Sequence, residues 1–517
     1  MKKNKSFAKT AFLMGVIILA SKLMGLARDV LTARAFGTTD YAIAYETASK
    51  LPLTIFDFVL GGVVTSAFIP IYNSISVKNG KNQAVSFLSS YINLILLITL
   101  AITAFGEAFA PLLVKFIAPE LSEATAALSV SLTRIMFPMV VFVGLAFSFV
   151  GFLQSEGEYN LPAVISLVSN VIMCTYLLTL SDKFGVTGLA MAMLVGWIMQ
   201  ALVQLPTAVK KGLKYSPKSR INTPEITRAA KNTVPILLAT WTTPLCSLIN
   251  TRIASGIENG RAITALGYAN KLYIIIVGLF SFVATNLLFP YFSKSAAEGN
   301  RDESDRLTRT SIKTLVFIIT PISVGVTTLA EPFISLIYEK GSFTHSDTLL
   351  TAEALRCYAV GMIFSAVTEI LTKAFFAAED NKKPMYSAAV AMIVNILLVV
   401  VFGDRLTTGG VALVTSAVAA VNMVLNLVFA IKTGLVSAKK NDILDIIKSV
   451  VCAAAMGAVI VAFVHYIPLN GRIVALLLPT LVGVTVYAIF AALTKSSEMT
   501  LLTDFLKSKL KRGERAE

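Results

Sequence analysis

Long apolar runs separated by short polar segments make up most of the chain, and their length predicts membrane-spanning helices. A helix that crosses a bilayer needs about 20 mainly apolar residues. Fourteen such stretches are predicted, centred near residues 20, 62, 98, 142, 170, 197, 240, 280, 322, 364, 395, 420, 455 and 482. The first begins after a short basic segment and has no small-residue cleavage site, so we expect it to stay as a helix and not to act as a signal peptide.

Composition favours the same class of protein. Of 517 residues, 56% are hydrophobic and only 15% are charged, against about 25% charged in soluble proteins, which argues against a water-soluble enzyme. The cysteines lie in apolar runs without CxxC spacing and the two histidines are far apart, so neither a disulfide framework nor a metal centre is expected. These residues are Cys174, Cys246, Cys357, Cys452, His345 and His465.

Lysine and arginine residues are distributed unevenly between the two sides of the predicted membrane. Fourteen spans place both termini on one side, where 26 Lys and Arg residues fall in loops and tails, against six on the other side. Cytoplasmic loops are the ones enriched in Lys and Arg, so both termini are expected in the cytoplasm. The net charge of +15 is then mainly a topology signal, and nucleic acid is not an expected partner.

Internal similarity divides most of the chain into two halves. Arg134 and Pro162 recur as Arg356 and Pro384 at an offset of 222 residues, and residues 188–190 recur as 410–412 at the same offset. Each half contains six predicted spans, so the halves have the same orientation and form a parallel repeat.

The predicted fold is therefore an all-α polytopic membrane protein with 14 transmembrane helices. Two six-helix lobes occupy residues 1–215 and 216–436, two additional helices lie in 437–496, and a cytoplasmic tail covers 497–517. Paired lobes of this kind are typical of alternating-access transporters. The sequence has no Walker A motif, so an ion gradient, the membrane potential or the substrate gradient would have to supply the energy.

Charged residues inside the first span form the first part of a candidate site. Ser21, Lys22, Arg28 and Asp29 fall within one sector of a helix with 100° per residue. Each charge would cost about 2.5 to 3.5 kcal/mol if it faced lipid, so we expect them to face a hydrated cavity or each other. The alternative is a network of Lys22, Arg28 and Asp29 that only holds neighbouring helices together.

Two lysines related by the repeat extend this candidate site. Lys50 is expected near the outer end of the second span, with Pro52 at the start of the helix, and Lys271 at the start of the eighth span. Together with Lys22 and Arg28 they would make a cationic cavity, which suits a diphosphate. The alternative is that Lys50 and Lys271 extend to the outer interface.

Several short motifs resemble those of the MurJ (MviN) family, within the multidrug/oligosaccharidyl-lipid/polysaccharide exporter superfamily. In order, they are Ser21-Lys22-x-x-Gly25-x-Ala27-Arg28-Asp29, Ala33-Arg34-Ala35-Phe36-Gly37, Lys50-Leu51-Pro52, Ala67-Phe68-Ile69-Pro70 and Gly341-Ser342-Phe343-Thr344. The resemblance implies a flippase, not an enzyme, that moves lipid II, an undecaprenyl-diphosphate disaccharide-pentapeptide, from the inner to the outer leaflet of the bacterial cytoplasmic membrane. It also implies a lipid-tail groove at helices 13 and 14, and membrane lipids and cell-wall synthesis proteins as further partners.

The resemblance also implies roles for particular residues. Arg28 and Lys271 would be the principal diphosphate-binding cations, and Asp40 would shape the outer gate, whereas Phe56 stands where a family arginine falls. The predicted substrate-binding residues are Lys22, Arg28, Asp29, Lys50, Lys271, Ser21 and Asn250, and the predicted gate or supporting residues are Asp40, Glu46, Asp57 and Arg252.

Cofactors and competing functions complete the expectations. No cofactor is expected; some relatives hold sodium between helices 7, 11 and 12, and here Asn395 and Thr415 could contribute oxygen ligands. The alternatives are another exporter of the same superfamily, either a polysaccharide-lipid flippase or a drug antiporter, and a scaffold for cell-wall enzymes.

Overall fold

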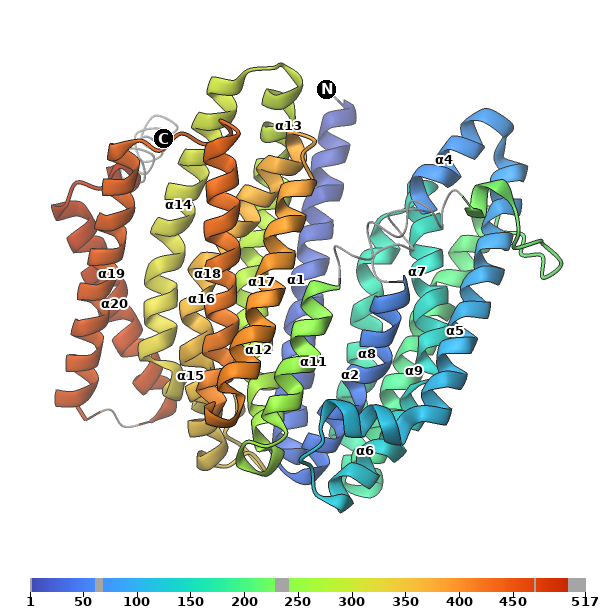
Figure 1. Ribbon diagram of the computed structural model, residues 1–517, viewed down its shortest axis with the longest axis horizontal. Coiled ribbons are helices and arrows are strands. Elements are labelled where there is room, and N and C mark those ends of the chain that lie inside the picture. Colours follow the sequence, from blue (N-terminus) through green and yellow to red (C-terminus); the bar gives the residue numbers. More distant parts are fainter. Residues whose placement is uncertain (1, 61–67, 228–240, 469–470, 501–517) are drawn as a thin grey trace, which may run out of the picture. The chain divides into compact units, whose positions relative to one another are not determined.

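The structure is a computed structural model that describes residues 2–60, 68–227, 241–468 and 471–500. These residues form helices joined by short connections, and none of them lies in a strand (Figure 1). The helices are α1 (Lys2–Phe36), α2 (Asp40–Leu60), α4 (Phe68–Asn79), α5 (Lys81–Ile117), α6 (Glu123–Met136), α7 (Met139–Ser155), α8 (Asn160–Thr179), α9 (Ser181–Lys210), α11 (Thr242–Ala254), η1 (Glu258–Gly260), α12 (Arg261–Val283), η2 (Ala284–Leu288), α13 (Phe289–Ala297), α14 (Arg301–Thr328), α15 (Ala330–Tyr338), α16 (His345–Ala377), α17 (Lys382–Phe402), η3 (Gly403–Arg405), α18 (Thr408–Lys432), α19 (Lys440–Tyr466) and α20 (Arg472–Leu493).

The described residues contain 10 helices long and apolar enough to cross a membrane, or 11 if α6 and α7, which meet at a 40° bend, form one span. The helix α1 covers the first predicted span. The predicted second and seventh spans centre on residues 62 and 240, which lie outside the described residues. The predicted class, an all-α polytopic membrane protein, is confirmed.

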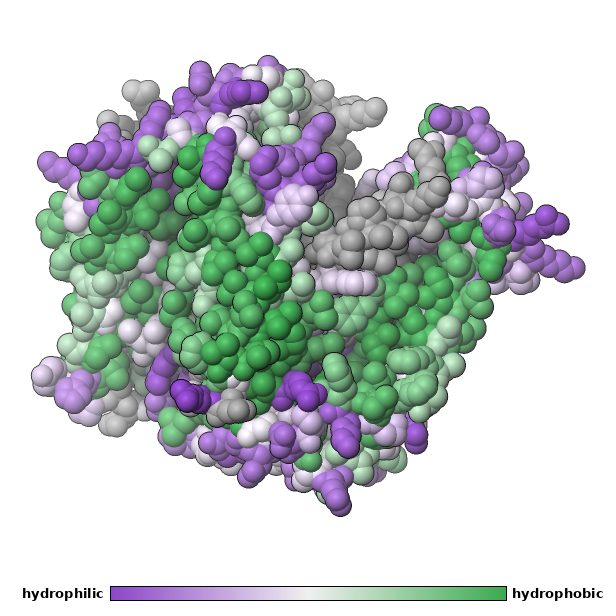
Figure 2. Space-filling view, in the orientation of Figure 1, coloured by the Kyte–Doolittle hydropathy of each residue, from purple (hydrophilic) through white to green (hydrophobic). Residues whose placement is uncertain are grey.

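The apolar side chains of the spans are largely turned outward, as expected for helices in contact with hydrocarbon. In α20 only 17% of the most apolar window is buried, and Leu477, Leu481 and Val484 are exposed. Figure 2 shows the same pattern over α14, α19 and α20, with an apolar surface along the helices and hydrophilic residues at their ends.

The chain divides into two compact units. Unit 1 contains residues 1–264 and the short segment Lys340–Thr344, and unit 2 contains residues 265–339 and 345–517. The helix α11 therefore packs with the N-terminal helices, although the repeat assigns it to the second half of the chain. Its contacts explain this: Trp241 Nε1 donates a hydrogen bond to the carbonyl of Phe58 (2.8 Å), and Arg252 donates to the carbonyl of Phe116.

The segment Lys340–Thr344 completes the C-terminal end of α1. The amide of Ser342 donates to the carbonyl of Arg34 (2.8 Å), and its hydroxyl donates to the carbonyl of Ala35 (3.0 Å). Gly37 and Gly341 both have positive φ, and a Cβ at either position would lie within 2.4 Å of backbone oxygen across this contact. Two carbonyls that a helix end leaves without partners are thus satisfied by residues about 300 positions later in the chain.

Small residues allow close approach of helices within unit 2. A Cβ at Gly361 of α16 would lie 2.6 Å from Oγ of Ser416 on α18, whose hydroxyl donates to the carbonyl of Cys357 (2.6 Å). Lipid provides no hydrophobic force between spans, so such contacts and interhelical hydrogen bonds hold the helices together.

Gly361→Ala is expected to destabilise the protein by about 1 to 3 kcal/mol, because the added methyl group must displace Ser416 or the backbone. The matched control is Gly325→Ala in α14, where a Cβ would meet no atom within 4 Å. Thermal unfolding in detergent should show a lower Tm for the first variant only. Equal Tm values for both variants would contradict the close approach of α16 and α18.

Ion pairs tie α19 and α20 to the rest of unit 2 at one end. Arg309 Nη1 of α14 lies 2.6 Å from Oδ2 of Asp442, and Lys313 Nζ lies 3.0 Å from Oδ1 of the same residue. Lys313 also lies 3.4 Å from Asp445 and 3.7 Å from Glu498, beyond the end of α20. Glu498 is buried, so the described start of the predicted tail packs on the protein; residues 501–517 lie outside the described residues.

A second ionic contact ties the connection between α19 and α20 to the corner between α15 and α16. Arg472 Nη2 lies 2.9 Å from Oε1 of Glu339, whose Oε2 accepts from the hydroxyl of Thr348 (2.8 Å) and lies 3.4 Å from Nδ1 of His345. Burial alone would raise the pKa of the Glu339 carboxyl, but these hydrogen bonds and the charge of Arg472 outweigh it and lower the pKa.

Glu339 is therefore expected to stabilise the fold above the pKa it has in the unfolded chain, and to lose this contribution as pH falls through its lower folded pKa. The Tm difference between the native chain and Glu339→Gln should be largest near neutral pH and shrink between about pH 5 and pH 3. A difference that stays constant over this range would contradict the ionic role of Glu339.

Candidate functional site

The centre of the candidate site is the guanidinium of Arg28, about three quarters of the way along α1. Its Nη2 and Nε donate to Oδ1 of Asp29 at 2.9 and 3.2 Å, and its Nη1 donates to Oδ1 of Asn170 on α8 at 3.0 Å. The amide of Asn170 donates in turn to the carbonyl of Ser21 at 3.4 Å. The side chain of Asn170 on α8 is thus hydrogen-bonded to α1 at both Ser21 and Arg28.

Asn170 was not identified from the sequence. A single asparagine in an apolar helix carries no spacing or charge signal, and its role depends on the packing of α8 against α1. A Cβ at Gly25 would lie 3.6 Å from the amide nitrogen of Asn170, which is an ordinary van der Waals contact.

Arg28 retains capacity to bind a further group. Its side chain is 29% exposed, against 8% for that of Asp29. A guanidinium has five N–H groups, and within the described residues three of them donate the hydrogen bonds above. The remaining two can donate to an anion that reaches the exposed side of the group.

The other predicted residues of α1 lie beside this network. The hydroxyl of Ser21 is buried, and within the described residues it has no hydrogen-bond partner. Lys22 is half-buried, one and a half turns before Arg28. Because Asp29 already neutralises Arg28, Lys22 makes this region of α1 net cationic.

Lys50 on α2 lies in unit 1 with Arg28 and contacts α11. Its Nζ lies 3.4 Å from Oγ1 of Thr251 and 3.9 Å from Oε1 of Glu46, one turn away on the same helix. Asn250, another predicted residue, precedes Thr251 on α11. The structure therefore brings Lys50, Glu46 and the end of α11 together.

The expected positions of Lys50, Pro52 and Lys271 near helix starts are wrong. The helix α2 begins at Asp40 and α12 at Arg261, so each lysine lies 10 residues inside its helix and Pro52 lies in the helix interior. Ten residues correspond to about 15 Å along a helix. Each helix begins about 10 residues before the position at which the sequence places its start.

Lys271 lies in unit 2, where its Nζ is 5.2 Å from the centroid of the Tyr268 ring. The Tyr268 ring packs in turn against that of Tyr338, with centroids 5.2 Å apart. An ammonium is attracted to the face of an aromatic ring, so Tyr268 helps to position this lysine.

Phe56 of α2, which stands where the family resemblance would place an arginine, is an apolar packing residue. The Phe56 side chain is buried and stacks on Phe147 of α7, with ring centroids 6.2 Å apart, whereas Asp57 is exposed. Residue 56 therefore belongs to the core of unit 1 and contributes no charge. Asp40 is exposed in the first turn of α2, where its negative charge interacts favourably with the positive end of the helix dipole.

Arg252, a predicted supporting residue, contacts the end of α5 at Phe116. Besides donating to the carbonyl of Phe116, its guanidinium lies 5.6 Å from the centroid of the Phe116 ring. It therefore caps the last turn of α5 from α11.

The sodium candidates Asn395 and Thr415 lie on the adjacent helices α17 and α18. Oδ1 of Asn395 is buried and has no hydrogen-bond partner within the described residues, whereas the hydroxyl of Thr415 donates to the carbonyl of Val411 (3.3 Å). The described part of the chain contains no group of three or more His, Cys, Asp or Glu residues that could hold a metal ion.

A family model, a curated relative and a solved structure all match this chain over most of its length. Residues 32–493 match the family model described as lipid II flippase MurJ. A probable lipid II flippase MurJ from Buchnera aphidicola subsp. Acyrthosiphon pisum is 26% identical over 454 residues, which cover 87% of this chain and 89% of the relative. A solved structure of lipid II flippase MurJ in an inward closed conformation aligns with a TM-score of 0.81 and 26% identity, covering 93% of this chain and 98% of the other. A multidrug resistance MATE family transporter of the MOP superfamily, in an inward-facing conformation, shares the fold, with a TM-score of 0.65 and 16% identity over 82% of this chain and 97% of the other.

Arg28→Ala is expected to lower stability by about 3 kcal/mol, because it leaves the buried carboxylate of Asp29 without its counter-charge. The double variant Arg28→Ala/Asp29→Asn should recover most of this loss, since no charge is then buried. Thermal unfolding in detergent measures both effects. Equal loss in the single and double variants would show that packing, not charge pairing, is what Arg28 contributes.

Proposed function

The chain belongs to the MurJ family, and from this premise we propose that it translocates lipid II from the inner to the outer leaflet by alternating access. It is a multi-pass protein of the cytoplasmic membrane and a transporter, not an enzyme. The chemical task is to carry a diphosphate and a polar disaccharide-pentapeptide across hydrocarbon, where an unshielded charge is costly.

The proposed binding site depends mainly on the orientation and partial exposure of the Arg28 guanidinium. This guanidinium is oriented by Asp29 and Asn170, is partly exposed, and has two N–H groups left over for an anion. A guanidinium can donate two parallel hydrogen bonds to phosphate oxygens. We assign Arg28 to the diphosphate, Lys22 to added positive charge, and Ser21 and Asp29 to orientation of α1.

Lys50 and Lys271 support this assignment as the pair related by the internal repeat. Each lies 10 residues inside its helix, so the two lysines occupy corresponding positions in their helices. Lys50 is held by Thr251 and Glu46, and Lys271 by the face of Tyr268. In the proposal each half of the repeat contributes one lysine to the substrate path, and Asn250 and Arg252 position the Lys50 side.

The further assignments concern the lipid tail, orientation and coupling. The helices α19 and α20 would provide the groove for the undecaprenyl tail, and both termini would lie in the cytoplasm, where the Lys-rich and Arg-rich connections fall. Asp40 and Asp57 would act at the outer and inner parts of α2. Coupling would use the membrane potential or sodium, with the free amide oxygen of Asn395 as an oxygen ligand of the kind sodium accepts.

The test measures whether lipid II reaches the outside of the cell. The native protein is depleted in its own host, and an impermeant enzyme that cleaves lipid II reports its exposure. Rescue is compared for the native chain, for Arg28→Ala/Asp29→Asn and for Arg34→Ala, which removes an exposed arginine of the same helix. We expect the double variant to restore exposure at least about tenfold less well, because a hydrogen bond to a charged group contributes about 1.5 to 3 kcal/mol.

The double variant removes the ion pair without leaving a buried charge. If the variant is present at the normal amount and lipid II is still not exposed outside the cell, the defect lies in substrate binding and not in folding of the protein. Arg34→Ala should rescue fully. Normal lipid II exposure after depletion, in a host without a second flippase, would contradict the proposed function. Full rescue by the double variant would leave the function intact and overturn the role of Arg28.

A further inference from the structure

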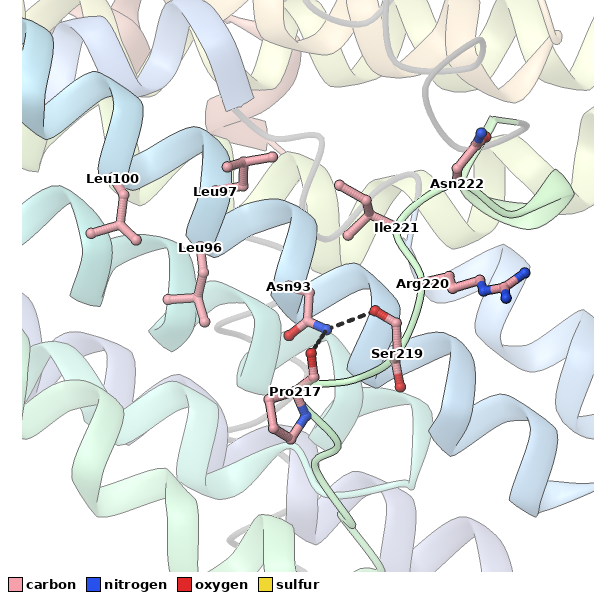
Figure 3. A pocket seen from close by; sticks show the side chains of 9 residues that line it. All are labelled: Asn93, Leu96, Leu97, Leu100, Pro217, Ser219, Arg220, Ile221 and Asn222. Atoms are coloured by element: carbon pink, nitrogen blue, oxygen red, sulfur yellow. Dashed lines mark hydrogen bonds between the residues drawn. The ribbon is translucent and has the colours of Figure 1, made fainter.

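A cavity of about 600 Å³ lies within unit 1, between α5 and the segment that follows α9 (Figure 3). None of the residues discussed for substrate binding lines it. The lining residues are Asn93, Leu96, Leu97, Leu100, Pro217, Ser219, Arg220, Ile221 and Asn222.

Two polar residues of α5 hold this segment in place. The hydroxyl of Ser89 donates to the carbonyl of Lys214 and accepts from the amide of Ser216, both at 3.2 Å. One turn later, Asn93 donates to the carbonyls of Ser219 (3.0 Å) and Pro217 (3.2 Å), as the dashed lines in Figure 3 show. The hydroxyl of Tyr215 donates to Oδ1 of Asn93 (2.7 Å). The wall opposite α5 is therefore fixed by specific hydrogen bonds.

The cavity is mainly apolar, with a cationic side chain at its edge. In Figure 3 Ile221 faces the leucines of α5, whereas the exposed side chains of Arg220 and Asn222 point away from these leucines. The segment is basic beyond the cavity as well, since Lys210, Lys211, Lys214 and Lys218 precede Arg220. Arg220 is the one of these cations that lines the cavity.

The apolar side continues along the membrane-spanning part of α5. Leu97, Phe105 and Leu112 are exposed, and at 100° per residue they fall within about 80° of one another, on one face of α5. From Leu97 to Leu112 this face is about 22 Å long, so an acyl chain that begins in the cavity has apolar surface of α5 to lie against.

We propose that this cavity binds an anionic phospholipid of the surrounding bilayer. The phosphate would lie at Arg220, with the amide of Asn222 as a further donor, and one acyl chain would cover Leu96, Leu97 and Leu100. An inorganic anion would leave the apolar side uncovered, and an uncharged lipid would leave the arginine without a counter-charge. The proposal does not depend on the transported substrate.

The test measures phosphatidylglycerol bound to the full-length protein in detergent by native mass spectrometry, with phosphatidylcholine as the uncharged reference. Arg220→Gln should weaken phosphatidylglycerol binding about fivefold, the effect of about 1 kcal/mol for one basic residue at a membrane surface. Its control is Lys218→Gln. This substitution also removes one positive charge, but Lys218 lies two residues before Arg220 and does not line the cavity. Leu100→Trp, which places a bulky ring in the part of the cavity next to α5, should weaken binding by a similar factor, and Leu112→Trp, outside the lining, should not.

Equal weakening by Arg220→Gln and Lys218→Gln would overturn the proposal, because it would show a diffuse basic surface. So would equal affinity of the native protein for both lipids. Displacement of phosphatidylglycerol by millimolar glycerol phosphate would show that the headgroup alone is recognised, and would overturn the assignment of the acyl chain to the leucines. All four substituted side chains are exposed, and Tm measurements verify that each variant remains folded.

Discussion

A charged side chain in the bilayer must have a partner, and this constraint explains the arrangement of α1 in unit 1. Arg28 and Asp29 are adjacent on one helix, and the pair is fixed in place by Asn170 of α8. The same asparagine reaches the backbone at Ser21, so the polar sector of α1 has a single orientation relative to α8. The packing of these helices and the geometry of the candidate site are thus determined by the same few hydrogen bonds.

The class of fold and the main charged residues could be predicted because both depend on features of the sequence itself. Apolar length predicts spans, and a charge within a span is conspicuous whatever surrounds it. The positions of Lys50 and Lys271 within their helices differ from the prediction because α2 and α12 begin earlier than the expected helix starts. Asn170 and the burial of Phe56 could not be predicted, since each depends on a neighbour from another helix.

The two helices outside the repeat are attached by charges at their ends and by apolar contacts between them. Asp442 and Asp445 meet Arg309 and Lys313 at one end, and Arg472 meets Glu339 at the other. In the middle, Gly457 allows α19 to approach Val324 of α14. Ion pairs at both ends fix the register of α19 and α20 along the rest of unit 2, while most of their apolar surface stays in contact with lipid.

The segment Lys340–Thr344 has a consequence for the order of synthesis. It packs into unit 1, although the residues on either side of it belong to unit 2. Membrane insertion follows the chain from its N-terminus, so α1 enters the bilayer long before Ser342 has been made. Until then the last carbonyls of α1 depend on water or lipid headgroups. The N-terminal unit is therefore finished only when about two thirds of the chain has left the ribosome, and its completion coincides with the assembly of the second unit.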